Sequence, residues 1–177
     1  MNMHATTIVA VKRGNETVIA GDGQVTMGQS IVLKNNAVKV RRMYNDKVVV
    51  GFAGSVADAF TLSERFEEML QKFSGNLLRS AVELAKSWRK DRYLRNLEAM
   101  MLVADNDKLL IVSGDGNVIE PENGIAAIGS GGNYALASAK SLAAHTKMSA
   151  REIAEAAMKI AAETCVFTNS HVTVEVV

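Results

Sequence analysis

The sequence predicts an α+β fold in which two antiparallel sheets pack face to face between two layers of helices. Strand-like apolar segments come in two blocks, residues 5–54 and 100–128, and each block is followed by two segments with helical spacing of apolar residues. A last strand-like segment, residues 171–177, ends the sequence. Because a sheet and an amphipathic helix each need to bury one face, this order of elements favours four layers: helix, sheet, sheet, helix.

Composition is typical of one globular domain and excludes several partner classes. The 177 residues are 48% hydrophobic and 22% charged, which is enough for a sizeable core. Twenty basic and nineteen acidic side chains leave a net charge of +1, so nothing calls for nucleic acid or an anionic membrane. One basic run, residues 86–95, decorates a helix end or offers a docking surface. The single cysteine, Cys165, and the lack of a signal peptide or membrane span suit the cytoplasm.

The first strand, residues 5–11, is the segment on which the functional hypothesis depends. Its β-branched and apolar composition favours a buried strand, and five residues precede Thr6. If this leader, residues 1–5, were removed, Thr6 would carry a hydroxyl and a free α-amine with an ordinary pKa of about 8, which can act as its base. The alternative is a disordered tail before an ordinary strand. We expect a leader over 1–5 and one domain over 6–177.

The segments that follow predict a hairpin and a loop. A polar turn at residues 12–16 leads into a second strand, residues 17–20, and then into Gly21-Asp22-Gly23-Gln24. Asp22 lies at the end of this strand, where it is either a functional carboxylate or a turn residue that bonds its own backbone. Residues 25–36 are expected to form a polar loop.

Two further strands carry a lysine and a run of small residues. Residues 37–44 alternate strictly and place Lys39 between two valines, and residues 47–54 form the most continuous apolar strand. The end of that strand, from Gly51 to Ser55, has little side-chain bulk, so its backbone N–H groups are open to a ligand.

The remaining elements are expected in a simple order. Ser55 and Asp58 form a capping pattern that opens the first helix, on which Phe60 belongs to the apolar face, and Ser149 and Glu152 form a second one that opens the last helix. The other segments are a helix over 77–88, strands over 100–104, 109–112, 117–120 and 125–128, and helices over 134–145 and 149–165.

Lys39 connects the candidate residues into one chemical hypothesis. An ammonium close to Thr6 would lower the pKa of its hydroxyl and of its amine, and would stabilise a developing alkoxide. Asp22 would pair with Lys39 and hold it charged. The alternative for Lys39 is a lysine at a sheet edge whose ammonium reaches solvent.

Other chemistries find little support. The turn Gly129-Ser130-Gly131-Gly132 lacks the Gly-Lys-Ser/Thr ending of a phosphate loop, and Gly21-Asp22-Gly23 lacks the third glycine of a dinucleotide fingerprint. The three histidines, His4, His145 and His171, fit no metal-ligand spacing. No nucleophile-elbow pattern supports a serine–histidine–aspartate triad.

Taken together, six motifs resemble one known family over essentially the whole chain from Thr6 onward. They are Thr6-Thr7-Ile8-Val9, Gly21-Asp22-Gly23-Gln24, Lys39-Val40-Arg41-Arg42, Gly51-Phe52-Ala53-Gly54 with Asp58, Ile128-Gly129-Ser130-Gly131-Gly132 and Cys165-Val166-Phe167-Thr168-Asn169. The chain resembles the HslV (ClpQ) peptidase family, the proteasome-β-like subunits of a bacterial ATP-dependent protease. The resemblance implies the α-β-β-α fold of N-terminal-nucleophile hydrolases, a double ring of six subunits each, and the AAA+ ATPase HslU (ClpY) as the partner that feeds in unfolded polypeptides.

The resemblance also implies roles for individual residues. The implied catalytic residues are Thr6 as nucleophile and base, Lys39 and Asp22 as its support, Ser130 around the amine, and the Gly54 N–H as oxyanion donor. The implied substrate cleft includes Gly51, Ala53, Ser55 and Val56. A monovalent cation, usually Na⁺, would bind backbone carbonyls of Ala162, Cys165 and Thr168; the family often has glycine at the first of these positions, so the backbone there must suit alanine. No nucleotide is expected on this chain.

The five residues before Thr6 depart from the many relatives in which threonine directly follows the initiator methionine. We expect either cleavage between Ala5 and Thr6 or a chain that is inactive as translated, a zymogen, because an amide nitrogen cannot accept the proton. Two other functions stay open: a catalytically silent ring scaffold for a partner ATPase, and an amidase that acts on a small amide.

Overall fold

The computed structural model describes residues 6–28, 30–91 and 99–177, which form eleven strands, four helices and a short 3₁₀ turn at Glu122–Gly124. The strands are β1 (Thr7–Arg13), β2 (Glu16–Asp22), β3 (Val25–Met27), β4 (Ile31–Lys34), β5 (Val40–Met43), β6 (Val48–Ala53), β7 (Met100–Ala104), β8 (Leu109–Ser113), β9 (Val118–Ile119), β10 (Ile125–Gly129) and β11 (Val172–Val176). The helices are α1 (Val56–Lys72), α2 (Leu77–Lys90), α3 (Gly132–His145) and α4 (Ala150–Thr164). None of the helices in these ranges is long and apolar enough to cross a membrane.

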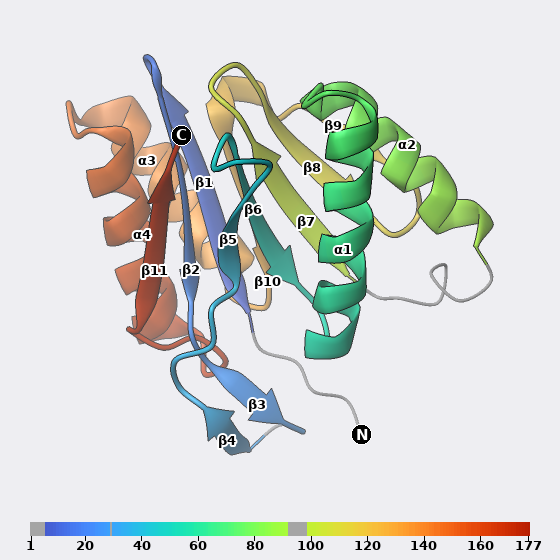
Figure 1. Cartoon of the computed structure of the whole chain (residues 1–177). Helices are drawn as coiled ribbons and strands as arrows, with labels where there is room; N and C mark the ends of the chain where they lie inside the picture. Colours follow the sequence, from blue (N-terminus) through green and yellow to red (C-terminus); the bar gives the residue numbers. More distant parts are fainter. Residues whose placement is uncertain (1–5, 29, 92–98) are drawn as a thin grey trace.

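Two antiparallel sheets form the centre of the molecule, as the sequence predicts. One has the strand order β10-β1-β2-β11, and the other has the order β5-β6-β7-β8-β9. Helices α3 and α4 cover the outer face of the first sheet, and α1 and α2 cover the outer face of the second (Figure 1). The predicted four-layer α+β sandwich is confirmed.

The alternation of side chains along β1 shows why both of its faces are buried. Ile8 and Ala10 point between the two sheets, where they pack with Ile19, whereas Val9 and Val11 belong to the cluster beneath α3 and α4. A period of two in a strand sends successive side chains to opposite faces. A continuous apolar run is therefore required here, because this sheet is covered on both sides.

Two helices begin at the serines that the sequence indicates. The Ser55 hydroxyl accepts the Asp58 N–H at 3.1 Å and caps α1. At α4 the capping box is complete, because the Ser149 hydroxyl accepts the Glu152 N–H and the Glu152 carboxylate accepts the Ser149 N–H at 2.8 Å. The Ser149 N–H is the main cause that lowers the pKa of Glu152.

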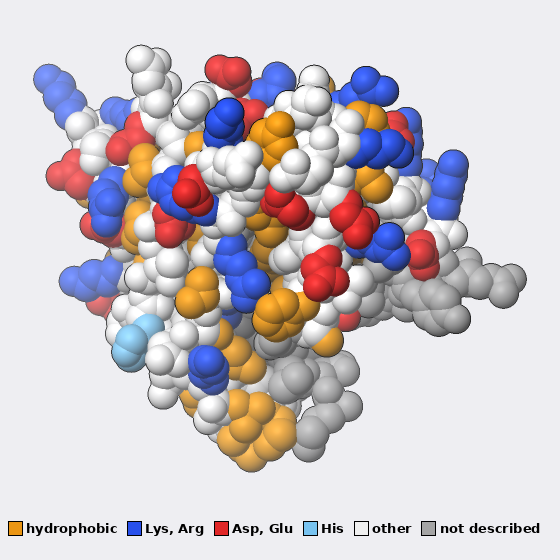
Figure 2. Space-filling model, viewed as in Figure 1, with side chains coloured by type: hydrophobic (Ala, Val, Ile, Leu, Met, Phe, Trp, Pro, Cys, Tyr) orange, Lys and Arg blue, Asp and Glu red, His pale blue; other side chains and the backbone are white. Residues whose placement is uncertain are grey.

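Two expectations from the sequence are wrong. Residues 25–36 are not a plain loop but contain the short hairpin β3–β4, which projects beyond the ends of the sheets (Figure 1). Its strand β4 presents Ile31, Val32 and Leu33 to solvent, and hydrophobic side chains gather at this end of the face shown in Figure 2. Phe60, expected on the buried apolar face of the first helix, is 51% exposed because it lines a cavity, under the Arg41 guanidinium at 4.8 Å.

Candidate active site

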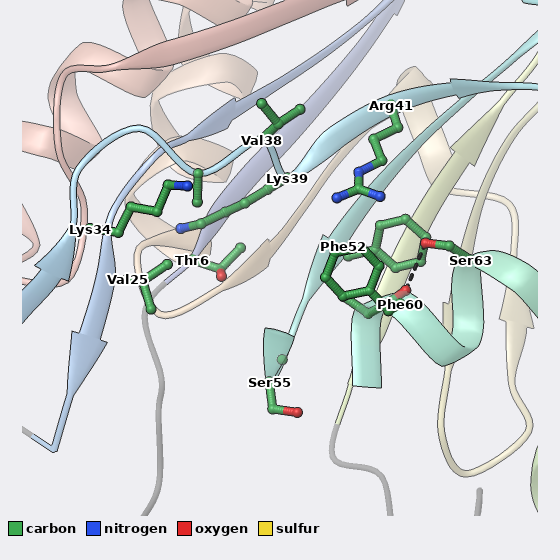
Figure 3. A pocket seen from close by; sticks show the side chains of 13 residues that line it. Thr6, Val25, Lys34, Val38, Lys39, Arg41, Phe52, Ser55, Phe60 and Ser63 are labelled. Carbon is green, nitrogen blue, oxygen red and sulfur yellow. Dashed lines mark hydrogen bonds between the residues drawn. The ribbon is translucent and has the colours of Figure 1, made fainter. Parts of the chain in front are cut away.

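A mainly apolar cavity of about 290 Å³ opens where the start of β1 meets β5 and the first turns of α1. Figure 3 shows the labelled side chains converging on it from several parts of the chain, including the start of β1, the β3–β4 hairpin, β5 and α1. Its lining residues are Thr6, Val25, Lys34, Ala37, Val38, Lys39, Arg41, Phe52, Gly54, Ser55, Ala59, Phe60 and Ser63. The cavity thus brings together Thr6, Lys39 and Gly54, which the sequence predicts as one site.

The first two threonines have different surroundings. Thr6 precedes β1 and reaches the cavity, whereas Thr7 is fully buried and its hydroxyl is 2.7 Å from the Thr168 hydroxyl. Thr7 Oγ1 is therefore occupied in a hydrogen bond inside the protein. Of these two hydroxyls, that of Thr6 is placed to meet a bound molecule.

Asp22 is the centre of the polar network behind Thr6. Its side chain is fully buried at the end of β2, and each of its oxygens accepts two hydrogen bonds. Oδ1 accepts the Thr7 N–H at 2.8 Å and the Lys39 ammonium at 2.9 Å. Oδ2 accepts the N–H of Gln24 at 3.0 Å and that of Asn169 at 3.3 Å. Four donors compensate for the burial of this carboxylate, since a buried charge needs hydrogen-bonding partners.

Lys39 lies immediately before β5, and its side chain extends toward Thr6 in the cavity that both residues line (Figure 3). Its ammonium also donates to the Gln24 carbonyl at 2.5 Å. Burial lowers the pKa of Lys39, and the charge and hydrogen bond of Asp22 oppose that shift. The cation is thus held against Asp22, beside the nucleophile candidate, where it can stabilise negative charge.

The glycine-rich turn after β10 packs directly against the start of β1. Gly129 has a positive φ of 91°, and a Cβ on it would lie 2.0 Å from the Thr6 carbonyl oxygen. A Cβ on Gly131 would lie 2.2 Å from Thr7 Oγ1. Ser130, between these two glycines, is exposed. The structure thus places the predicted turn beside Thr6, and the role of Ser130 at the amine stays a prediction.

The stretch predicted to line the substrate cleft divides into two parts. Gly54, with a φ of 145°, and Ser55 line the cavity. Gly51 and Ala53 are buried between the sheets instead, and a Cβ on Gly51 would lie 2.6 Å from Ile8. Alternation along β6 explains the correction, because it turns Phe52 toward the opposite face from Gly51 and Ala53. The side chain of Val56 is outside the described residues.

The last turn of α4 and the segment after it contain the residues predicted to bind a cation. Ala162 lies in the last turn of α4, where helical backbone suits alanine as well as glycine, and Cys165 caps the helix with its side chain buried. The Cys165 carbonyl accepts the Thr168 N–H at 3.0 Å. Among the described residues, no group of three or more His, Cys, Asp or Glu side chains could hold a metal ion.

Two residues of the network were not singled out from the sequence. They are Gln24, whose carbonyl accepts a hydrogen bond from the Lys39 ammonium, and Asn169, which forms hydrogen bonds with Asp22, Gly23 and Asn35. Both belong to motifs on which the resemblance depends, Gly21–Gln24 and Cys165–Asn169. Their position in the same motifs as Asp22 and Thr168 was the signal in the sequence that could have identified them.

A four-layer sandwich with a threonine at the start of β1 and a lysine–aspartate pair behind it defines the proteasome type of hydrolase. A scan of protein families agrees, because the Proteasome family (Proteasome subunit) matches residues 2–177. The chain belongs to this family and is a proteasome-type protease subunit, an N-terminal threonine hydrolase.

More specifically, the chain is similar to proteins named ATP-dependent protease subunit HslV. It is 60% identical to the one from Listeria innocua and 59% identical to the one from Listeria welshimeri, in each case over 177 residues and 99% of both chains. The solved HslV of Trypanosoma brucei matches with a TM-score of 0.92 and 50% identity, over 96% of this chain and 98% of that one. The BPH protein of Thiobacillus denitrificans shares the fold, with a TM-score of 0.73 and 20% identity over 97% of each chain.

Proposed function

We propose that the chain is the threonine endopeptidase of an ATP-dependent protease that degrades unfolded or misfolded polypeptides. The observation that carries the proposal is the double role of Asp22 Oδ1, which accepts both the N–H next to Thr6 and the Lys39 ammonium. One oxygen thereby ties the backbone that positions the nucleophile to the cation that activates it.

The mechanism requires removal of residues 1–5, which converts the Thr6 nitrogen from an amide into an amine. The amine takes the proton from the Thr6 hydroxyl as the oxygen attacks the peptide carbonyl carbon. Lys39 favours the deprotonated forms, and the Gly54 N–H is our choice for the donor to the oxyanion. The C–N bond then breaks, the proton passes from the amine to the leaving nitrogen, and water hydrolyses the acyl ester and regenerates Thr6.

The proposal includes assembly and a partner. The relatives are named subunits of an ATP-dependent protease, and the sequence of this chain carries no nucleotide motif, so we assign ATP hydrolysis to a separate AAA+ unfoldase of the HslU type. The exposed run Ile31–Leu33 supports burial of β4 in a larger assembly, for which we propose a double ring of six subunits each. We place the enzyme in the cytoplasm, in keeping with its unpaired Cys165.

We also propose a monovalent cation, Na⁺, near the carbonyls of Ala162, Cys165 and Thr168. The residues fit such an ion because the C-terminal turn of a helix presents carbonyl oxygens at the negative end of its dipole. The Cys165 carbonyl accepts one hydrogen bond and has a second lone pair. A bound cation would stabilise the segment that carries Thr168 and Asn169 into the site.

The first test is the intact mass together with Thr6→Ala. We expect the mature enzyme to lack residues 1–5 and Thr6→Ala to lose peptide hydrolysis, because the nucleophilic hydroxyl is gone, while the protein still assembles. Thr61→Ala is the matched control, since its hydroxyl bonds only within the exposed face of α1. Fluorogenic-peptide and casein cleavage, with and without the ATPase, are the readouts.

Three outcomes would redirect the proposal. Cleavage by a chain that retains its leader would exclude the Thr6 amine as the base. A retained leader without activity would favour a zymogen or a silent scaffold. Hydrolysis of small amides without cleavage of polypeptides in the presence of the ATPase would favour an amidase.

A further inference from the structure

The carboxamide of Asn169 joins its own segment to two others, residues 22–24 and residues 35–39, which are far from it in the sequence. Its Oδ1 accepts the N–H of Gly23 and that of His171, each at 3.2 Å, and its Nδ2 donates to the Asn35 carbonyl at 2.8 Å. Its backbone N–H donates to Asp22. An asparagine side chain is suited to this place because it carries an acceptor and a donor together.

Both segments that Asn169 joins determine the position of Lys39. The acceptors of its ammonium, Asp22 Oδ1 and the Gln24 carbonyl, flank Gly23. The backbone that leads to Lys39 starts at Asn35, the other partner of the Asn169 carboxamide. Asn169 therefore holds both the backbone that carries the acceptors of the ammonium and the backbone that leads to Lys39.

The two segments are in tight contact where Asn169 holds them. The Ala37 N–H donates to the Gly23 carbonyl at 2.9 Å. A Cβ on Gly23 would lie 2.5 Å from the Asn35 carbonyl oxygen. Because the backbones approach so closely, a small displacement of one segment must move the other, and the Lys39 ammonium with it.

We propose that Asn169 is a positioning residue of the protease, whose carboxamide clamps residues 22–24 to residues 35–39 and so holds Lys39 beside Thr6. The inference rests on the proposed threonine mechanism. It assigns Asn169 no contact with substrate: the residue acts through Asp22 and Lys39. It also gives the segment after α4 a part in positioning the catalytic lysine.

The test measures kcat, KM and the pH profile of kcat/KM for a fluorogenic peptide, with the assembled enzyme after leader removal. We expect Asn169→Ala to lower kcat by about 10- to 100-fold with a smaller change in KM, because a misplacement on the order of 1 Å at a catalytic group has that effect. Asn169→Asp keeps the acceptor for Gly23 and His171 and loses the donor to Asn35, so its kcat loss should be smaller. Asn106→Ala, in the exposed β7–β8 turn, is the matched control.

The pH profile separates positioning from a general loss of structure. The Thr6 amine must be deprotonated to act as base, and a nearby cation lowers its pKa. If Lys39 moves away, that pKa rises, and the acid limb of the profile moves to higher pH. The other charged groups of the cavity, Lys34 on β4 and Arg41 on β5, are unchanged by the substitution.

The outcomes distinguish this inference from the proposed function. If Thr6→Ala abolishes hydrolysis while Asn169→Ala leaves kcat and the acid limb unchanged, the clamp is overturned and the threonine mechanism stands. If Thr6→Ala retains hydrolysis, the proposed function fails first. If Asn169→Ala does not assemble, Asn169→Asp carries the test, and a wild-type kcat in that variant would exclude a role for the bond to Asn35.

Discussion

At the scale of single residues, the site depends on positions that have no side chain. Gly129 lies against the Thr6 carbonyl, Gly131 against the Thr7 and Thr168 hydroxyls, and Gly23 against Asn35. In each case the missing Cβ leaves room for a neighbouring group, which is backbone at Gly129 and Gly23 and two hydroxyls at Gly131, to approach more closely than any other residue would allow. These glycines define the distance between β10, β1 and the loop before Lys39.

Gly129→Ala should abolish most activity, because its Cβ would lie 2.0 Å from the Thr6 carbonyl oxygen and its φ of 91° disfavours alanine. Gly132→Ala, three residues away, is the control: its Cβ would make an ordinary contact at 3.4 Å with Ala127, at the first position of α3. We expect kcat/KM to fall by at least about 100-fold in the first variant and to stay within about twofold in the second. Equal activity of the two would show that Gly129 does not set the position of Thr6.

The residues of the site that could be predicted from the sequence are those whose side-chain chemistry indicates a role without knowledge of their neighbours in the fold. A threonine behind a short leader, an aspartate at a strand end and a lysine between valines can be recognised in the sequence, and the resemblance joined them. Gly51 was assigned to the cleft because small residues look alike in a sequence, whether they face a ligand or the opposite sheet. Asn169 was missed because its function lies in contacts with Gly23 and Asn35, which the fold alone brings near.

At the scale of elements, helix caps and alternating strands were predicted well because their signals are local. Ser55 and Ser149 begin helices where expected, and β1, β2 and β6 follow their apolar runs. The β3–β4 hairpin was missed because three- and four-residue strands give no period to detect, and β4 is apolar on an exposed surface. Element order sufficed for the layers because each amphipathic element has few ways to bury its face.

Helix α4 is followed by the segment that carries Thr168 and Asn169. The capping box at the start of α4 therefore stabilises the helix from which this segment extends into the site. Ser149→Ala should cost about 1 kcal/mol and lower the apparent melting temperature by about 2–4 °C. Ser141→Ala, on the exposed face of α3, is the control and should be neutral.

The same cap should show a dependence on pH. The pKa of Glu152 lies below its ordinary value of 4.5 because of Ser149, so its contribution is present above pH 4.5 and is lost as pH falls through the lowered pKa. In Ser149→Ala the hydroxyl bond is gone, and the loss of stability below pH 4.5 should be shallower. Melting curves between pH 3 and pH 7 measure it, and identical slopes for the variant and the wild type would show that the hydroxyl bond does not contribute to the lowered pKa of Glu152, which the Ser149 N–H alone would then explain.

At the scale of the whole molecule, the active site is a relation between two sheets. Thr6 immediately precedes β1 and Asp22 ends β2 of one sheet, whereas Lys39 and Gly54 lie at the ends of β5 and β6 of the other. The cluster between the sheets, which includes Ile8, therefore fixes the distance across the cavity. Packing in this layer is a determinant of catalysis as well as of stability.

Gly51→Ala tests this relation, because its Cβ would lie 2.6 Å from Ile8 Cγ2 and 3.2 Å from Ile19 Cγ2, at a position where alanine has no backbone strain. We expect a destabilisation of about 1–3 kcal/mol by overpacking and a lower kcat/KM. Ile8→Ala removes the contacted methyl group, so the double variant should be more stable than the sum of the single effects by about 0.5–3 kcal/mol. Leu84→Ala, in the separate cluster beneath α1 and α2, should instead add to Gly51→Ala without coupling. Additivity with Ile8→Ala in both stability and kcat/KM would mean that the spacing between the sheets does not govern the site.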